Sequence, residues 1–548
     1  MEVLNHIEGN VVDVLNRRIY PAALQIENGV ITRITPQNIA YNRYILPGFV
    51  DAHVHIESSM LTPSEFARLA VVHGTVATVS DPHEIGNVLG VAGVEFMLQN
   101  AAQTPLKICF GAPSCVPATA FETAGAAITP SDIEYLFSRY AQIQYLSEMM
   151  NFPGVLFEDA AVMQKLAIAQ KYGKPIDGHA PGLRGKDAQR YIAAGITTDH
   201  ECFTLEEALE KLQYGMKILI REGSAAKNFE ALHPLITSHT GQTMLCSDDK
   251  HPNDLVHGHI DQLVRRALAK GHELMNVLQC ACINPVLHYG MQVGLLQPGH
   301  AADFIVTDDL TALPILETYI NGNLVAENGK TRLDYVAAPT PNKFMAHPKK
   351  PRDFTIAATG KTVNVIEALE GQLITNALQF DALTDAQGNA LTNTNTDVLK
   401  LTVVNRYQNA PPAVAFIKNF GLKRGALASS VGHDSHNLIA VGVSDHDICQ
   451  AINLLIEARG GLSVSDAQNG IAHVLPLPIA GLMTPENGYK VAQQYTQTDK
   501  LVKQLGCQLY APYMTLSFMA LLVIPALKLS DLGLFNGNTF TFSPVFDN

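Results

Sequence analysis

The sequence predicts an α/β protein whose centre is a (β/α)8 TIM-like barrel, with a small flanking β-sheet domain and a C-terminal α+β domain. A strand-then-helix rhythm repeats eight times over roughly 250 residues, the usual size of such a barrel. Antiparallel β patterns flank this stretch. After about residue 345, the pattern of apolar and polar residues becomes that of an α+β domain. Alternating strands and helices favour a parallel sheet. The 548 residues suffice for two or three domains with large cores.

Short strands and turns flank the barrel on both sides. Apolar residues alternate there between turn-forming residues, which is typical of antiparallel strands. The expected strands are 11–15, 23–26 and 29–32 before the barrel, and 298–306 and 318–323 after it. Because the ends of a domain often lie close together, we expect residues 1–45 and 296–345 to form one composite β domain.

The barrel is expected to span residues 46–295, since each candidate strand there is followed by a bend and a helical stretch. The expected strands are 45–51, 75–80, 106–110, 143–147, 175–178, 195–198, 216–220 and 244–246. A polar, Pro-containing linker then leads to a C-terminal α+β domain at 350–548. That domain is expected to hold a strand at 398–404, a helix at 448–457 and a last strand at 539–543.

Composition and charge exclude several classes of partner. The net charge of −13 argues against nucleic acid, whose phosphates require clustered Lys and Arg. No apolar stretch approaches the ~20 residues of a membrane span. The start, Met1 to Asn5, lacks the segments of a signal peptide. With eight cysteines that form no CxxC pair, these features predict a cytoplasmic protein with reduced thiols and no membrane partner.

The most informative motif is His53-Val54-His55, at the end of the apolar run that begins at Leu46. In a β-strand, residues i and i+2 point to the same face. The two imidazoles are therefore expected to converge on one point, as a metal ion requires. The motif falls at the carboxyl end of the first barrel strand, where such barrels keep their chemistry. On its own, the motif fits ordinary surface or core histidines about equally well.

Chemically competent residues also follow the other expected strands. They are Asp81, His83, Glu84, Glu148, His179, His200, Arg221, Glu222 and Asp248. Taken alone, each of these residues more often has a structural role than a catalytic or metal-binding one. In a barrel, however, these positions all lie at one mouth, the end where the strands finish. The favoured ligand set is His53, His55, Glu148, His179, His200 and Asp248. It offers nitrogen and oxygen without thiolate and suits Zn, Mn or Fe, and Glu148 could bridge two ions.

This set resembles the amidohydrolase superfamily, whose ligands are His-x-His on strand one, Lys or Glu on strand four, His on strands five and six, and Asp on strand eight. Longer motifs resemble the two-metal, bacterial type of adenine deaminase. They are residues 47–59, 81–85, 148–154, 177–181, 198–201, 221–225 and 246–250. The resemblance covers most of the chain, C-terminal domain included. Glu148 stands where other subfamilies use a carboxylated lysine.

The resemblance implies a hydrolase that converts adenine to hypoxanthine and ammonia in purine salvage, by attack of metal-activated hydroxide on C6. It implies two divalent ions, Mn2+ or Fe2+ with Zn2+ as an alternative, and a homo-oligomer. Asp248 is the expected general base, and Glu84 is the second expected catalytic residue. The expected substrate contacts are Asp81, His83, Arg221, Glu222 and Ser224. For these contacts, loop salt bridges or helix caps are about equally favoured.

Several alternatives stay open at this level. Asp81, His83 and Glu84 could hold an additional metal ion, and Glu57 and Glu201 could orient ligand histidines instead of doing chemistry. The loop at 432–437, rich in His and Asp, is favoured as an exposed polar turn over a cap on the barrel mouth. Rival functions are a different aminated heterocycle or cyclic amide as substrate, and a barrel that binds metal without catalysis.

Overall fold

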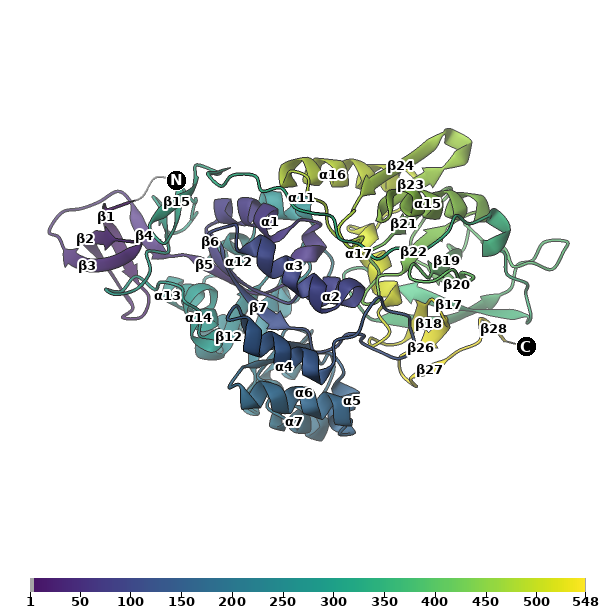
Figure 1. Ribbon diagram of the computed structural model, residues 1–548, viewed down its shortest axis with the longest axis horizontal. Helices are drawn as coiled ribbons and strands as arrows, with labels where there is room; N and C mark the ends of the chain where they lie inside the picture. The colour runs from purple at the N-terminus through teal and green to yellow at the C-terminus, as the bar shows by residue number, and fades with distance from the viewer. Residues whose placement is uncertain (1–3, 548) are drawn as a thin grey trace.

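Eight parallel strands form the barrel at the centre of the molecule, in a computed structural model that describes residues 4–547 (Figure 1). The strands are β5 (Phe49–Val54), β6 (Thr75–Ser80), β7 (Lys107–Ala112), β8 (Ile143–Met149), β9 (Ile176–Gly178), β10 (Thr198–Asp199), β11 (Lys217–Arg221) and β12 (Thr243–Cys246). Of the starting segment Met1 to Asn5, residues 1–3 lie outside the described residues.

The barrel consists of two parallel sheets, β5 to β9 and β10 to β12, that adjoin at both edges. At one edge, the backbone N–H of Asp248 donates to the carbonyl of His53 (2.9 Å), and the N–H of His55 donates to the carbonyl of Asp248 (3.3 Å). At the other, the N–H of Thr197 donates to the carbonyl of Ile176 (2.9 Å). The predicted barrel fold is thus confirmed.

The predicted first strand, 45–51, is wrong in its bounds. The structure divides it into β4 (Tyr44–Pro47), which belongs to another sheet, and β5, with Gly48 between them. Both strands are buried along their whole lengths apart from Tyr44, so the apolar run continues across the break and hides it. As a result, His53 lies inside β5 and not beyond its end.

Helices cover the outside of the barrel (Figure 1). They are α1 (Pro63–Ala70), α2 (His83–Leu89), α3 (Val91–Ala101), α4 (Pro130–Arg139), α5 (Phe152–Leu156), α6 (Ala160–Lys171), α7 (Gly185–Ala193), α8 (Leu205–Gln213), α9 (Phe229–Leu232), α10 (Leu235–Ser238), α11 (Pro252–His257), α12 (Ile260–Ala269), α13 (Leu274–Leu278) and α14 (Asn284–Tyr289). Local sequence sets several starts: Thr129 and Asp132 form a capping box for α4.

A sheet beside the barrel joins segments from both flanks. Its strand order is β16-β15-β14-β13-β4-β1-β2-β3. The further strands are β1 (His6–Asp13), β2 (Arg18–Glu27), β3 (Val30–Pro36), β13 (Phe304–Thr307), β14 (Glu317–Ile320), β15 (Asn323–Glu327) and β16 (Lys330–Thr331). The first of these ends earlier than predicted, because Asp13 accepts the N–H of Asn16 in a turn (3.2 Å).

The C-terminal part contains a large mixed sheet and a small antiparallel one. Their strands are β17 (Thr362–Ala368), β18 (Thr375–Asp381), β19 (Leu399–Val404), β20 (Ala413–Lys418), β21 (Ala426–Ser429), β22 (Leu438–Gly442), β23 (Gly461–Asp466), β24 (Ile471–Pro476), β25 (Leu527–Ser530), β26 (Gly533–Asn536), β27 (Thr541–Phe542) and β28 (Phe546–Asp547). The helices are α15 (Asp445–Ala458), α16 (Gly488–Gln504) and α17 (Pro512–Ser517). The strand predicted at 539–543 is not the last, because β28 follows it and pairs with β17.

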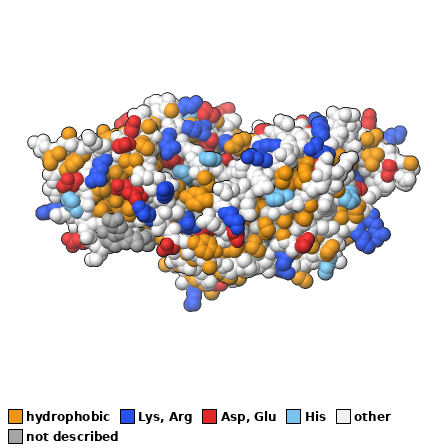
Figure 2. All heavy atoms as spheres, turned by 90° about the horizontal axis from the view of Figure 1, so that it is seen from above, with side chains coloured by type: hydrophobic (Ala, Val, Ile, Leu, Met, Phe, Trp, Pro, Cys, Tyr) orange, Lys and Arg blue, Asp and Glu red, His pale blue; other side chains and the backbone are white. Residues whose placement is uncertain are grey.

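This C-terminal part lies directly on the barrel (Figure 1). The N–H of Thr484 donates to the carbonyl of Met60 (3.0 Å), and the N–H of Gly488, at the start of α16, donates to the Glu65 carboxylate (2.8 Å). The predicted domain boundaries stay a prediction. On the face seen in Figure 2, basic, acidic and apolar side chains are interleaved. No helix within residues 4–547 is both long and apolar enough to cross a membrane.

Gly48 offers a direct test of the passage between the two sheets. A Cβ added there would lie 2.3 Å from a methyl carbon of buried Val76. Gly48→Ala is therefore expected to cost about 1–3 kcal/mol and to lower the melting midpoint by about 1–3 °C, measured by calorimetry. Gly241→Ala is the matched control, because its added Cβ would meet nothing closer than 4.0 Å. Equal midpoints for the two variants would contradict this account.

Candidate metal centre and active site

The barrel closure places three predicted ligands side by side. Asp248 follows β12 and forms a bridge with Val54 of β5, and its hydrogen bonds to the backbone of His53 and His55 fix its position. Its φ of 54° lies in the left-handed region, which Asp tolerates better than most residues. This backbone geometry holds the Asp248 carboxylate beside the two imidazoles.

The six predicted ligands gather at the carboxyl ends of the strands. His53 Nε2 lies 3.2 Å from His55 Nε2, and His55 Nε2 lies 3.3 Å from Asp248 Oδ1. On the other side, His200 Nε2 lies 3.1 Å and His179 Nδ1 2.7 Å from Glu148 Oε2. The sequence prediction had placed these residues at one mouth, and the structure brings them together there.

Glu148 faces both halves of this cluster with different oxygens. Its Oε2 is directed at His179 and His200, while its Oε1 lies 3.4 Å from His55 Nε2. A carboxylate that presents one oxygen to each side has the arrangement of a ligand that bridges two ions. The sequence position of Glu148 alone could not reveal this orientation.

The cluster fits a divalent metal by its spacing and its chemistry. Two atoms bound to one ion at about 2.0–2.2 Å lie roughly 3–3.5 Å apart, and most of these separations fall there. Buried groups of three or four such side chains have ligand atoms within 4.8 Å of one another, including His53, His55 and Asp248. The donors are imidazole nitrogen and carboxylate oxygen, which suit Zn, Mn or Fe.

The carboxylates of the cluster are held as anions. Burial alone would raise the pKa of Glu148, but the imidazoles of His179 and His200 keep that pKa well below its ordinary value. Burial acts the same way on Asp248, and Arg221 and the neighbouring imidazoles keep its pKa well below the ordinary value. Both side chains therefore enter any reaction as negatively charged acceptors.

Arg221 and Glu201 support the ligands from behind. The Arg221 guanidinium forms two hydrogen bonds with Glu201 (2.5 and 2.9 Å) and a further one with Asp248. Glu201 Oε1 in turn lies 3.4 Å from His200 Nε2 and 3.5 Å from His179 Nδ1. Because its two terminal nitrogens bond to Glu201 and Asp248, Arg221 holds these carboxylates in place behind the imidazoles, and it also lines the cavity over the cluster.

A cavity lies over the cluster. Barrel residues form one side: His55, His83, Glu84, Glu148, Met150, His179, His200, Glu201, Arg221, Asp248 and Asp249. The C-terminal part closes the other side with Leu373, His433, Asp434, Phe518 and Leu521. Polar groups and a small apolar wall thus line one space above the cluster.

The loop at 432–437 closes over the barrel, so the expected exposed turn is wrong. His433 and His436 are 5% and 0% exposed. His433 Nδ1 lies 2.8 Å and His436 Nε2 2.5 Å from different oxygens of Glu84. Although burial opposes it, contact with Glu84 raises the pKa of His433 to about 9, and the two imidazoles hold the pKa of Glu84 well below its ordinary value.

His83 lies between the metal cluster and this loop. Its Nδ1 lies 3.1 Å from Asp81 Oδ2, and its Nε2 lies 3.7 Å from Asp434 Oδ1. Asp81 is fully buried and does not line the cavity, so it orients His83 instead of facing a substrate. The alternative that Asp81, His83 and Glu84 hold an additional metal ion together does not match these positions. The ligand atoms of Asp81 and His83 lie near that of His55, whereas the ligand atom of Glu84 lies near those of Asp249 and His433.

Two predicted substrate contacts point away from the cavity. The Glu222 carboxylate pairs with Arg266 (2.5 Å), and the Ser224 hydroxyl bonds to Asp254 (2.5 Å). Neither residue lines the cavity among the described residues. The sequence placed them correctly after β11, but a chain that turns after a strand can direct a side chain either inward or outward.

Glu57 is a further correction. It was expected to orient a ligand histidine, but its carboxylate accepts the N–H of Ile85 (3.2 Å) and, within the described residues, no ligand imidazole. Burial and then the nearby Glu84 raise the pKa of Glu57 to about 7. Glu57 therefore binds a free backbone N–H in the first turn of α2.

Sequence reasoning missed the apolar wall. Leu373, Phe518 and Leu521 come from segments well beyond the barrel in the chain, and no spacing links them to it. The polar part of the wall did leave a signal, because the run from Gly432 to Asn437 concentrates His and Asp in one loop.

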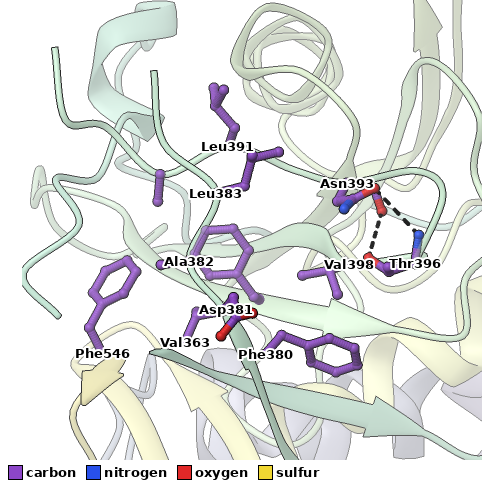
Figure 3. A pocket seen from close by; sticks show the side chains of 12 residues that line it. Val363, Phe380, Asp381, Ala382, Leu383, Leu391, Asn393, Thr396, Val398 and Phe546 are labelled. Carbon is purple, nitrogen blue, oxygen red and sulfur yellow. Dashed lines mark hydrogen bonds between the residues drawn. The ribbon is translucent and has the colours of Figure 1, made fainter. Parts of the chain in front are cut away.

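A second cavity, of about 600 Å3, opens on the C-terminal part (Figure 3). Its lining is mostly apolar, including Phe380, Val398 and Phe546, and Asp381 is its one titratable lining residue. The polar atoms of Asn393 and Thr396 bond to each other at its rim. It therefore offers neither metal ligands nor paired acid and base, and the chemistry belongs to the barrel mouth.

Comparisons with known proteins identify the family of the chain. The amidohydrolase family model matches residues 44–325, and that of the adenine deaminase C-terminal domain matches residues 372–541. An adenine deaminase of Sulfurovum sp. (strain NBC37-1) is 55% identical over 537 residues, or 98% of each chain. Those of Salinibacter ruber and Methanosarcina barkeri are 54% and 50% identical over 98% of this chain and 98% and 99% of their own.

The barrel and the buried cluster of His, Asp and Glu at its mouth define a hydrolase of the amidohydrolase family, and the chain belongs to that family. Within it, the matching C-terminal domain and the full-length similarity place the chain among the adenine deaminases. The family resemblance that the sequence motifs suggested is confirmed.

Glu148 is the predicted ligand that faces both sides of the cluster. Glu148→Gln keeps the shape of the side chain but removes the charge, so purified protein is expected to retain one divalent ion or fewer instead of two. Elemental analysis by mass spectrometry measures this. Glu222→Gln is the matched control and is expected to keep both ions, because Glu222 lies outside the cavity. Two ions in Glu148→Gln would refute the bridging role.

Proposed function

We propose that this protein hydrolyses adenine to hypoxanthine and ammonia. The observation that carries the proposal is a cavity lined both by residues of the six-residue cluster and by Glu84 and His433. One end of this space offers metal ligands and a carboxylate base, and the other offers polar and apolar groups for a flat ring. The names of the full-length relatives support the substrate.

Six side chains would hold two divalent ions, Mn2+ or Fe2+ by preference: His53, His55, Glu148, His179, His200 and Asp248. Glu148, with one oxygen toward each half, would bridge them. When bound, the ions would supply Lewis-acid activation that makes water a strong nucleophile at neutral pH. Several groups of imidazoles and carboxylates that share Glu148, His53 or His200 support this stoichiometry.

Asp248 would act as the general base. Its carboxylate would accept a proton from the water that attacks C6 and would pass it to the exocyclic amine, which leaves as ammonia. The Arg221 hydrogen bond to one carboxylate oxygen keeps the other directed at His53 and His55. Glu201 holds Arg221 from the far side and so prevents the base from turning away.

Glu84 would read the purine edge. Its carboxylate, kept ionised by His433 and His436, would accept an N–H of the ring, and His433 would donate to a ring nitrogen. Leu373 and Phe518 would pack on the ring faces. The loop at 432–437 would exclude water from the bound purine, which strengthens these hydrogen bonds.

The same ligands would also serve other amidohydrolase reactions, so the choice of adenine depends on the cavity wall. A different aminated heterocycle is the second candidate, because Glu84 and His433 could pair with other ring edges. The expectations of a homo-oligomer, a cytoplasmic location and no nucleic-acid or membrane partner stay predictions.

Ammonia release from adenine tests the reaction. Protein reconstituted with Mn2+ is expected to turn over adenine, with adenosine, cytosine, guanine and a hydantoin assayed in parallel. Turnover of another substrate alone would keep the metal centre but discard the proposed purine contacts. If protein with two bound ions turned over none of them, the non-catalytic barrel would become the better explanation.

Asp248→Asn tests the base. The amide keeps the size of the side chain but cannot accept the proton, so kcat is expected to fall at least ~100-fold. Metal content must be measured on the same samples, because Asp248 is also a proposed ligand. Near-normal kcat in protein with two ions would show that another group accepts the proton.

A further inference from the structure

Lys528 is a buried amine whose partners are both backbone carbonyls. It lies in β25 and is 0% exposed. Its Nζ donates to the carbonyls of Leu373 (2.5 Å) and Phe518 (2.9 Å), and within the described residues no carboxylate pairs with it. By contrast, buried Lys211 lies between Asp199 and Glu207 (2.5 and 2.7 Å). Lys528 is thus not part of an ion pair.

Its two hydrogen bonds match the donors of an uncharged amine. A neutral –NH2 group carries two N–H donors, and both are used here. A protonated amine would carry a third N–H, for which the described residues show no acceptor, and a buried unpaired donor is costly. In agreement with this, burial lowers the pKa of Lys528 to about 7.

The two carbonyls belong to the two segments that form the apolar wall of the cavity. Leu373 lies in the turn between β17 and β18, and Phe518 begins the short helical turn after α17. Both side chains line the cavity. Since these segments belong to different elements, the Lys528 amine is a direct polar link between them.

The link continues to the polar end of the cavity. The Phe518 ring lies 5.4 Å, centre to centre, from the His433 ring, at an angle of 32°. His433 in turn bonds to Glu84. A displacement of the Phe518 backbone would therefore move both the apolar wall and one partner of the proposed purine contact.

We propose that Lys528 is a positioning residue for the substrate: its amine ties the Leu373 and Phe518 segments together and so sets the shape of the purine-binding wall. This inference rests on the proposed function. Lys528 touches none of the reacting groups, and the wall contacts the ring in the ground state and the transition state alike. Its loss is therefore expected to raise KM more than it lowers kcat.

Steady-state kinetics on the Mn2+ holoenzyme test this. Lys528→Met keeps the length and apolar stem of the side chain but removes both donors, so KM for adenine is expected to rise about tenfold or more, with kcat within about threefold. Lys400→Met is the matched control. Lys400 is also buried in the C-terminal part and bonds to the Phe354 carbonyl (3.3 Å) and Asp445 (2.5 Å), away from the cavity. Its KM is expected to stay within about twofold of wild type.

Three results would overturn the proposal: an unchanged KM in folded Lys528→Met, an equal KM rise in Lys400→Met, or a fall in kcat alone. If Lys528→Met does not fold, hydrogen exchange of the wild-type holoenzyme decides. Saturating hypoxanthine is expected to slow exchange in 369–375 and 514–521 together, and no slowing in either segment would reject the role. Wild-type turnover is measured first, so that failure of adenine deamination itself is recognised separately.

Discussion

The two backbone hydrogen bonds between Asp248 and β5 are the constraint on which the site depends. They close the barrel between its first and last strands, and they fix three proposed ligands through the main chain. A flexible side chain alone could not hold a carboxylate in register with two imidazoles so firmly, because each free rotamer costs entropy to restrain. The hydrogen bonds that close the barrel are thus the same ones that position the proposed metal ligands.

The cluster at the barrel mouth contains several buried charged groups, and each carboxylate there lies beside a basic partner. Glu148 is surrounded by imidazoles, and Asp248 and Glu201 share Arg221. A buried carboxylate without such partners would be protonated or would destabilise the fold. The imidazoles and carboxylates that pair with one another also have the spacing of ligands to a divalent ion. Metal binding and the stability of the fold are therefore expected to be coupled.

The second organising feature is that two parts of the chain share one cavity. The barrel supplies the metal cluster and Glu84, while the C-terminal part supplies His433, Leu373 and Phe518. In the proposed function, chemistry and substrate recognition are thereby separated, because the wall could change the preferred ring without altering the proposed metal ligands. Lys528 extends this division of roles, since it acts on the wall from within the C-terminal part.

The sequence by itself determined the barrel and the family, because period and motif are local properties. The His-x-His spacing, the residues at or just past the ends of β8, β9, β10 and β12, and the eightfold rhythm all follow from strand geometry, which fixes where a side chain can point. The sequence could not show that Gly48 separates two buried strands, because an apolar run has the same pattern whether it lies in one sheet or crosses from one sheet to another.

Only the tertiary structure decided the direction of Glu222 and Ser224, the burial of His433 and the apolar wall. Turns after strands can direct a side chain either way, and contacts between segments hundreds of residues apart leave no periodic pattern. They arise when two separately folded surfaces meet.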